Sequence, residues 1–168
     1  MKRILLIVIL ILQTSLAYSA GVGSKDKKDT ASTGLKPSSK FEVGKKWVSK
    51  GKKFENKKKQ AKAKNAYEKA IKNLLEANSK NPSDPDTLNL LGFSHRKIGD
   101  YSNAEIYYAM GLAIDPKHVG INEYMGELFV ATNRIDEAKK RLSILEDCNC
   151  KEYNELKQII EGTKQSKY

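Results

Sequence analysis

The sequence predicts an all-α fold in which helix pairs stack as an α-solenoid. The main observation is that similar residues recur every 34 positions, the length of one helix-turn-helix unit. The matching positions are Tyr67, Tyr101 and Ile135; Ala70, Ala104 and Ala138; and Leu74, Tyr108 and Leu142. Pro82 and Pro116 keep the same step, as do Gly92 and Gly126. Because one helix pair cannot bury its apolar face alone, about three such units must stack.

The segment 85–118 shows how one unit is built. Ser83 is predicted to cap its first helix, with Pro85 at the first helical position and Asp86 closing an S-x-x-D box. Apolar and small residues then recur at three- and four-residue spacing, which is one face of a helix. They are Leu88, Leu91, Gly92 and His95 on the first helix, and Tyr101, Ala104, Tyr108, Gly111 and Leu112 on the second. The pair Gly99-Asp100 ends one helix and caps the next, and Gly92 is predicted to face Ala104 where the two helices cross.

The same segment resembles a tetratricopeptide repeat, whose pattern is W-x2-L-G-x2-Y, then G-x-Y-x2-A-x3-F-x2-A and a final proline. The matching positions are Leu88, Leu91, Gly92, His95, Gly99, Tyr101, Ala104, Tyr108, Gly111 and Pro116. The resemblance implies a right-handed superhelix over residues 41–165. The period places its repeats near 51–84, 85–118 and 119–152, and a one-sided apolar pattern predicts a capping helix at 151–162.

The first helix of the first repeat departs from the family pattern. In the strict 34-residue register, Lys57 and Lys58 stand where leucine and glycine are expected. In a second register, the stretch from Trp47 to Phe54 fits W-x2-L-G-x2-Y with Lys50 in the leucine place, but extra residues must then precede Tyr67. Both registers predict an unusual and long first helix.

The amino-terminal residues predict export. Residues 1–20 resemble a secretory signal peptide, with Lys2 and Arg3 before an apolar run from Ile4 to Leu12 and a small-residue cleavage site near Ser19 and Ala20. An uncleaved membrane anchor is the alternative, although the run is shorter than a spanning helix needs. Residues 21–40 are polar and are predicted to be a disordered linker. We therefore expect a periplasmic or secreted protein with no transmembrane segment after signal removal.

Lysines concentrate in one stretch of the chain, which we call the Lys-rich segment 45–64. The formal net charge is +11, and most of it comes from the chain before residue 65. A solvated helix face accounts for such a segment, and so does a surface that binds anionic lipid, lipopolysaccharide or cell-wall polymer. Nucleic acid is not expected, because the segment lacks the interleaved aromatic and arginine side chains that stack on bases.

The two cysteines, Cys148 and Cys150, are separated by one residue near the end of the third repeat. A disulfide, a pair of thiols and a metal site are all compatible with this spacing, and an exported protein meets an oxidising compartment. A metal would need two more ligands, and His95 and His118 lie in other repeats. We expect a structural role for His95, and neither a metal nor a cofactor.

No catalytic motif is present in the sequence. It contains no G-x-S-x-G, H-E-x-x-H, phosphate-binding loop or Cys-x2-Cys pair, and no serine has a base nearby. We therefore expect a protein that is not an enzyme.

The family resemblance implies a concave groove, lined mainly by the first helices, that takes a protein or peptide partner. Carried over by position, its lining consists of Asn89, Phe93, Arg96, Lys97, Glu123, Glu127 and Val130, with a contribution from lysines of 52–62. Glu55 stands where relatives that grip a terminal carboxylate have their first lysine, so that ligand is not expected. The predicted function is an exported adaptor or assembly scaffold, and the alternative is surface binding through the Lys-rich segment 45–64.

Overall fold

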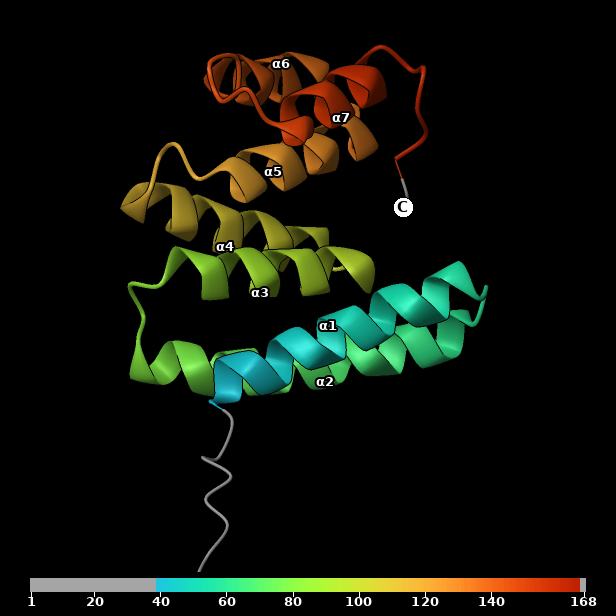
Figure 1. Ribbon diagram of the computed structural model, residues 1–168, viewed down its shortest axis with the longest axis vertical. Helices are drawn as coiled ribbons and strands as arrows, with labels where there is room; N and C mark the ends of the chain where they lie inside the picture. The colour runs from blue at the N-terminus through green and yellow to red at the C-terminus, as the bar shows by residue number, and fades with distance from the viewer. Residues whose placement is uncertain (1–38, 167–168) are drawn as a thin grey trace, which may run out of the picture. The chain divides into compact units, whose positions relative to one another are not determined.

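A computed structural model describes residues 39–166 of the chain, and all regular structure in that range is α-helical (Figure 1). The helices are α1 (Lys40–Asn56), α2 (Gln60–Lys80), α3 (Pro85–Lys97), α4 (Tyr101–Ile114), α5 (Val119–Ala131), α6 (Ile135–Ile144) and α7 (Lys151–Ile160). This confirms the predicted all-α fold. The predicted signal peptide, and all of the predicted linker except Ser39 and Lys40, lie outside the described residues.

The helices form three consecutive pairs, α1 with α2, α3 with α4 and α5 with α6, and each pair packs on the next. The first helix α3 also contacts both α1 and α5, so the three first helices form one layer of the stack. Helix α7 packs against α5 more than against α6, and therefore occupies the place that a further first helix would have. The α-solenoid and its terminal helix are thus as the sequence predicts.

Polar side chains mark where the helices begin. The Ser39 hydroxyl accepts from the Glu42 amide at 3.3 Å, and Asp100 accepts from the Asn103 amide at 3.2 Å. At the start of α3 the cap is Asp84 and not Ser83 as predicted, because Pro85 occupies the first helical position directly after Asp84. The turn before α4 uses Gly99 at a φ of +85°, a conformation that favours glycine.

Two glycines allow the helices of a pair to cross closely. A Cβ atom on Gly92 would lie 2.5 Å from the Tyr108 ring, and a Cβ on Gly51 would lie 2.5 Å from the Tyr67 ring. Gly92 therefore faces Tyr108 and not Ala104 as predicted. Gly51 and Tyr67 are separated in sequence by the same distance as Gly92 and Tyr108, so Gly51 takes the glycine place that the second register gives it. Tyr67 takes the place of Tyr108 and not that of Tyr101, so the extra residues follow Tyr67 in α2 and do not precede it.

The first repeat therefore begins earlier than predicted. Residue 51, the predicted start of 51–84, lies in the middle of α1, and the first helix pair runs from Lys40 to Lys80. Gly51 in the middle of α1 follows Lys50, where the family pattern has leucine. The 34-residue register is therefore supported only by residues after α1. The extra residues of this pair lengthen α1 and α2 relative to the later helices.

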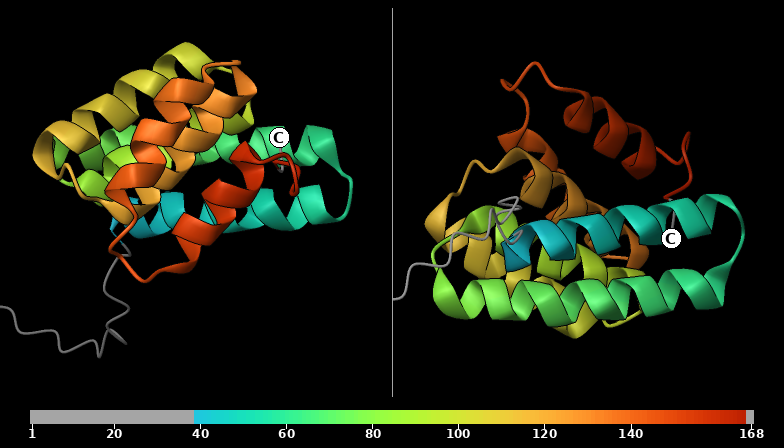
Figure 2. Two further views of the ribbon diagram at one scale, coloured as in Figure 1. Left: turned by 90° about the horizontal axis from the view of Figure 1, so that it is seen from above. Right: turned by 60° about the horizontal axis from the view of Figure 1, so that its bottom comes forward.

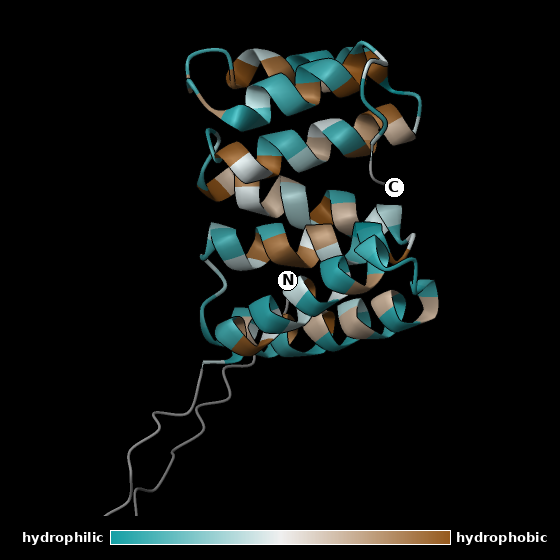
Figure 3. Ribbon diagram, turned by 45° about the vertical axis from the view of Figure 1, so that its right-hand side comes forward, coloured by the Kyte–Doolittle hydropathy of each residue, from teal (hydrophilic) through white to brown (hydrophobic). Residues whose placement is uncertain are grey.

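The apolar core has two main clusters. One lies between α1, α2 and α3, and contains Val48, Tyr67, Leu74, Leu91 and Phe93 among others. The other lies between α4, α5 and α6, and contains Ala104, Tyr108, Ile121, Leu128 and Ala138 among others. Figure 3 shows hydrophilic and hydrophobic residues alternating along the helices of the first pair.

The loop before α7 contains both cysteines, and the structure joins Cys148 to Cys150 by a disulfide. Cys150 is also the residue that precedes the first turn of α7. The bond therefore constrains the loop from which α7 starts. Within the part of the chain that the structure describes, no helix is both long enough and apolar enough to cross a bilayer.

Replacing Ala104 with leucine should destabilise the fold, because Ala104 is fully buried in the second cluster. Overpacking of this kind costs about 1–3 kcal/mol of unfolding free energy. The matched control is Ser102→Leu on the exposed side of α4, which should cost less than about 0.5 kcal/mol. Asn103 is less suitable, because its amide donates to the capping residue Asp100 at 2.7 Å.

The measurement is thermal unfolding followed by circular dichroism at a helix wavelength. Equal midpoints for Ala104→Leu and Ser102→Leu would contradict the register of α4 described above.

Candidate functional site

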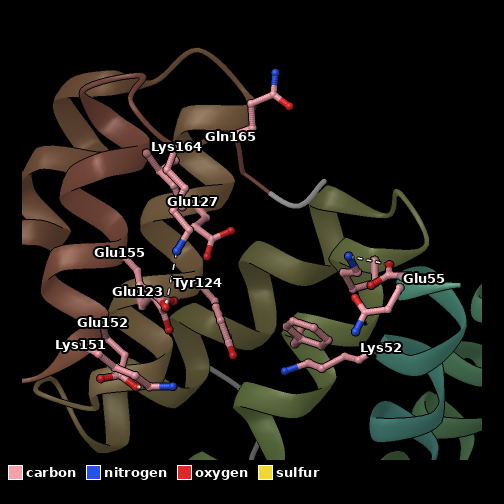
Figure 4. A pocket seen from close by; sticks show the side chains of 14 residues that line it. Lys52, Glu55, Glu123, Tyr124, Glu127, Lys151, Glu152, Glu155, Lys164 and Gln165 are labelled. Carbon is pink, nitrogen blue, oxygen red and sulfur yellow. Dashed lines mark ion pairs between the residues drawn. The ribbon is translucent and has the colours of Figure 1, made fainter. Parts of the chain in front are cut away.

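A groove of about 270 Å³ lies along the layer of first helices (Figure 4), and we call it the inner groove. Helices α1, α3, α5 and α7 and the segment after α7 line it. The lining residues are Lys52, Glu55, Asn56, Phe93, Lys97, Glu123, Tyr124, Glu127, Lys151, Glu152, Glu155, Ile159, Lys164 and Gln165. Most of them are charged, so the inner groove suits a polar ligand.

Four of the predicted groove residues line the inner groove: Phe93, Lys97, Glu123 and Glu127. Arg96 lies beneath the surface, since its side chain is only 1% exposed. It supports the groove and does not face it.

The remaining two predicted residues lie elsewhere. Asn89 is half-buried beside Gly120 at the start of α5. Val130 is half-buried and packs against the cluster between α4, α5 and α6. Neither belongs to the lining of the inner groove.

The prediction did not include the far wall of the groove. Glu152, Glu155 and Ile159 come from α7, which was predicted only as a capping helix. Tyr124 was also missed, although it stands between the two glutamates of the predicted lining. Its ring centroid lies 5.0 Å from that of Phe93, and the two rings form the floor of the groove.

On the α1 and α3 side, Glu55 holds three helices together. It accepts from the Tyr67 hydroxyl of α2 at 3.0 Å and lies 2.6 Å from the Lys97 ammonium group of α3. Burial lowers the pKa of Lys97, while the contact with Glu55 opposes this shift. Glu55 and Lys97 therefore neutralise each other on this side of the groove.

Lys52 reaches across the floor of the groove from α1. Its ammonium group lies 4.4 Å from the centre of the Phe93 ring and 5.8 Å from that of Tyr124, within the range of a cation–π interaction. Burial lowers the pKa of Lys52, and the nearby glutamates Glu123 and Glu55 oppose this shift. The groove therefore presents one cation above two aromatic rings.

A buried ion pair joins α3 to α5 below the floor. Arg96 Nη1 lies 3.2 Å from Glu127 Oε2 and donates to the Tyr124 carbonyl oxygen at 3.2 Å. Removing one partner of such a pair leaves a buried charge and typically costs about 3–5 kcal/mol. The pair therefore fixes the position of Tyr124 and of Glu127 in the groove.

The α5 and α7 side carries four glutamates, which face Lys52 and Glu55 across the groove in Figure 4. Glu123 is 4% exposed, and burial raises its pKa to about 8, helped by Glu127 and by a hydrogen bond with Glu155. Burial also opposes ionisation of Glu155, yet its hydrogen bond with Glu123 and its contact with Lys164 hold its pKa below the usual value. At neutral pH the raised pKa of Glu123 thus favours its protonated form, which can donate to the Glu155 carboxylate.

The segment after α7 turns back toward the groove (Figure 2). Lys164 Nζ lies 3.5 Å from Glu155 Oε1, and the Ser166 hydroxyl donates to Glu127 Oε2 at 3.1 Å. The glutamates of this wall therefore already accept one ammonium group and one hydroxyl group from the protein's own chain.

Both histidines serve the helix turns. His95 Nδ1 lies 2.9 Å from Asp100 Oδ2, and its ring stacks on Tyr107. His118 Nδ1 accepts from the Ile121 amide at 3.1 Å, while its Nε2 lies 3.1 Å from Asp86 Oδ1. Among the described residues, no group of three or more histidine, cysteine, aspartate or glutamate side chains could hold a metal ion.

Comparison with known proteins identifies the class. Residues 85–118 match the sequence model of the family described as Tetratricopeptide repeat. No curated protein matches the sequence.

Solved structures resemble the fold of the chain. The second TPR domain of the human RPAP3 protein, in complex with the HSP70 peptide SGPTIEEVD, is 17% identical with a TM-score of 0.54, over 73% of this chain and 95% of that chain. The Arabidopsis OM64 TPR domain is 19% identical with a TM-score of 0.48, over 74% of this chain and 99% of that chain. Residues 85–118 are thus a tetratricopeptide repeat, and the described residues have the fold of the RPAP3 domain.

Stability should fall as the pH rises from about 4.5 to about 8, in part because of Glu123. Its folded-state pKa of about 8 exceeds the usual value of 4.5, so in this window the unfolded chain releases a proton that the folded protein keeps. The contribution of Glu123 to the unfolding free energy is fully present below the pKa of the unfolded chain. It is lost as the pH rises through the pKa of the folded protein, at up to about 1.4 kcal/mol per pH unit.

The variant Glu123→Gln keeps a donor toward Glu155 but cannot ionise. We expect its unfolding midpoint to exceed that of the wild type at pH 8 and to approach it at pH 5. Glu68→Gln, which removes an exposed carboxylate on α2, is the matched control. If the unfolding midpoints of Glu123→Gln and the wild type differ by the same amount at every pH in this range, Glu123 does not keep its proton in the folded protein.

Proposed function

We propose that the protein is an exported scaffold without catalytic activity, which binds a segment of a partner protein in the inner groove. The observation that carries the proposal is the set of charges held in fixed positions around the Phe93 and Tyr124 rings. Lys52 lies on one side and Glu123, Glu127 and Glu155 on the other. Because Arg96 and Lys164 already pair with Glu127 and Glu155, a ligand orders few side chains on that wall when it binds.

A peptide ligand is consistent with relatives of this fold. The human RPAP3 domain described above is titled as a complex with a peptide. That peptide ends in Glu-Glu-Val-Asp, whereas the inner groove has Lys97 already paired with Glu55 and four glutamates on its α5 and α7 side. A different peptide chemistry therefore fits this protein.

The contacts of the carboxyl-terminal segment indicate that chemistry. Lys164 and Ser166 place an ammonium group and a hydroxyl group on Glu155 and Glu127. A partner segment with a basic or hydroxyl side chain can make the same contacts after displacing them. An acidic or carbonyl group of that segment would then meet Lys52 across the floor.

A photo-crosslinking residue in place of Asn56, exposed at the groove on α1, should capture the partner in intact cells. The same residue in place of Ile106, which is 55% exposed on α4, is the matched control. We expect protein adducts from position 56 that are absent from position 106 and reduced several-fold by Lys52→Glu. Identical adducts from both positions, or none from position 56, would contradict binding in the inner groove.

Export rests on residues 1–20, which carry the features of a secretory signal. The proposed location is the periplasm or the exterior. Mass spectrometry of the protein purified from cells should show a chain that lacks the residues up to about Ser19 or Ala20. A chain that starts at Met1 would instead support an uncleaved anchor.

A further inference from the structure

A second groove lies between α1 and α2, and it shares no lining residue with the inner groove. We call it the outer groove, and its volume is about 610 Å³. Its lining residues are Trp47, Lys50, Lys53, Phe54, Lys57, Ala61, Lys62, Asn65, Ala66 and Lys69. This volume lies within the range of about 300–1,000 Å³ found for sites that hold small ligands.

The apolar residues of the outer groove lie together. Trp47 and Phe54 come from α1, seven positions apart on the same helix face, and Ala61 and Ala66 come from α2. The small alanine side chains leave room beside the two aromatic rings. An apolar group that enters this space removes both rings from water, which is favourable.

Five lysines surround the apolar residues, three from α1 and the turn after it and two from α2. They are Lys50, Lys53, Lys57, Lys62 and Lys69. Within residues 39–166, none of the five ammonium groups lies in an ion pair with a carboxylate. Lys50 and Lys69 instead lie over the Trp47 ring, at 4.2 and 4.7 Å from its centre. An anionic ligand would relieve the repulsion between these cations.

A ligand that satisfies both features has an anionic head and an apolar tail. A bare polyanion would leave the aromatic rings in water, and a purely apolar ligand would leave the lysines without counter-charges. All five cations are lysine, whose compact and mobile ammonium groups suit mobile phosphates better than a fixed bidentate contact. Tryptophan is also the side chain that favours the boundary between lipid headgroups and acyl chains.

An acidic amphipathic helix is the other ligand with these properties. It would need carboxylates along both of its edges, because lysines flank the outer groove on the α1 side and on the α2 side. A layer of anionic headgroups supplies negative charge on every side at once. The distribution of the lysines therefore favours lipid.

We propose that the outer groove binds anionic phospholipid at a membrane surface, with an acyl chain against Trp47 and Phe54 and phosphate groups on the surrounding lysines. This site is independent of the inner groove, so either can be present without the other.

Trp47 is the one tryptophan in the sequence, so its fluorescence reports on the outer groove alone. The full chain is mixed with vesicles of phosphatidylglycerol and phosphatidylcholine whose acyl chains are brominated. We expect quenching of Trp47 emission that is much weaker with phosphatidylcholine alone and weaker at high salt. Because quenching requires contact with the brominated chain, binding through the apolar residues 4–12 does not by itself produce it.

The variant Lys53→Gln/Lys62→Gln removes two charges from the outer groove without changing the lysines that cover Trp47. It should weaken the affinity for the vesicles, as measured by quenching, by about tenfold or more, since each lysine near an anionic surface contributes substantially to binding. The matched control Lys139→Gln/Lys140→Gln removes two exposed charges from α6 and should have the wild-type affinity.

Three results would overturn the proposal. The first is the absence of quenching with the vesicles that contain phosphatidylglycerol. The second is quenching as strong with phosphatidylcholine alone as with phosphatidylglycerol, or as strong for Lys53→Gln/Lys62→Gln as for the wild type. The third is a shift of Trp47 emission that occurs with an acidic amphipathic helical peptide of glutamate and leucine but not with the vesicles. That third result would make the outer groove a docking site for protein.

Discussion

The close crossing of the two helices in the first and in the second pair is the constraint on which the stack depends. Gly51 and Gly92 bring α1 and α3 so near to their partners that the rings of Tyr67 and Tyr108 fill the space where a Cβ would be. Both tyrosines are fully buried, so they leave no room for the helices to slide. Once the crossing is set, the side chains on the opposite faces of the first helices point into one continuous groove.

Charged residues hold this groove in shape, which is unusual because burying charge is costly. Arg96, Glu123 and Glu127 are each at most 5% exposed. Their contacts run between α3, α5 and α7, so Glu123 and Glu127, which line the groove, also help to fix the spacing of the helices. The proton on Glu123 lowers the charge of the α5 and α7 side, and allows four glutamates to share one wall. Stability and recognition therefore depend on the same side chains.

The sequence predicts the second and third helix pairs well because their glycine, tyrosine and alanine positions follow one period. It fails for the first pair, where Lys50 replaces the apolar residue that would have fixed the register before Gly51. It also fails for α7, since the pattern of one amphipathic helix does not reveal which neighbour its polar face meets. Glu152 and Glu155 lie in the groove only because α7 packs against α5, a contact between distant residues.

The position of α1 explains why its lysines cannot be treated as one uniform surface. Lys52 and Glu55 face the inner groove, whereas Lys50, Lys53 and Phe54 face the outer one, because neighbouring residues of a helix are about 100° apart around its axis. The contact of Gly51 with Tyr67 sets the rotation of the helix and thus assigns each lysine to its side. A rotation of α1 by one residue position would turn Lys52 away from the inner groove and Lys50 away from the outer one. The irregular first repeat is therefore the element that gives this solenoid two chemically different surfaces.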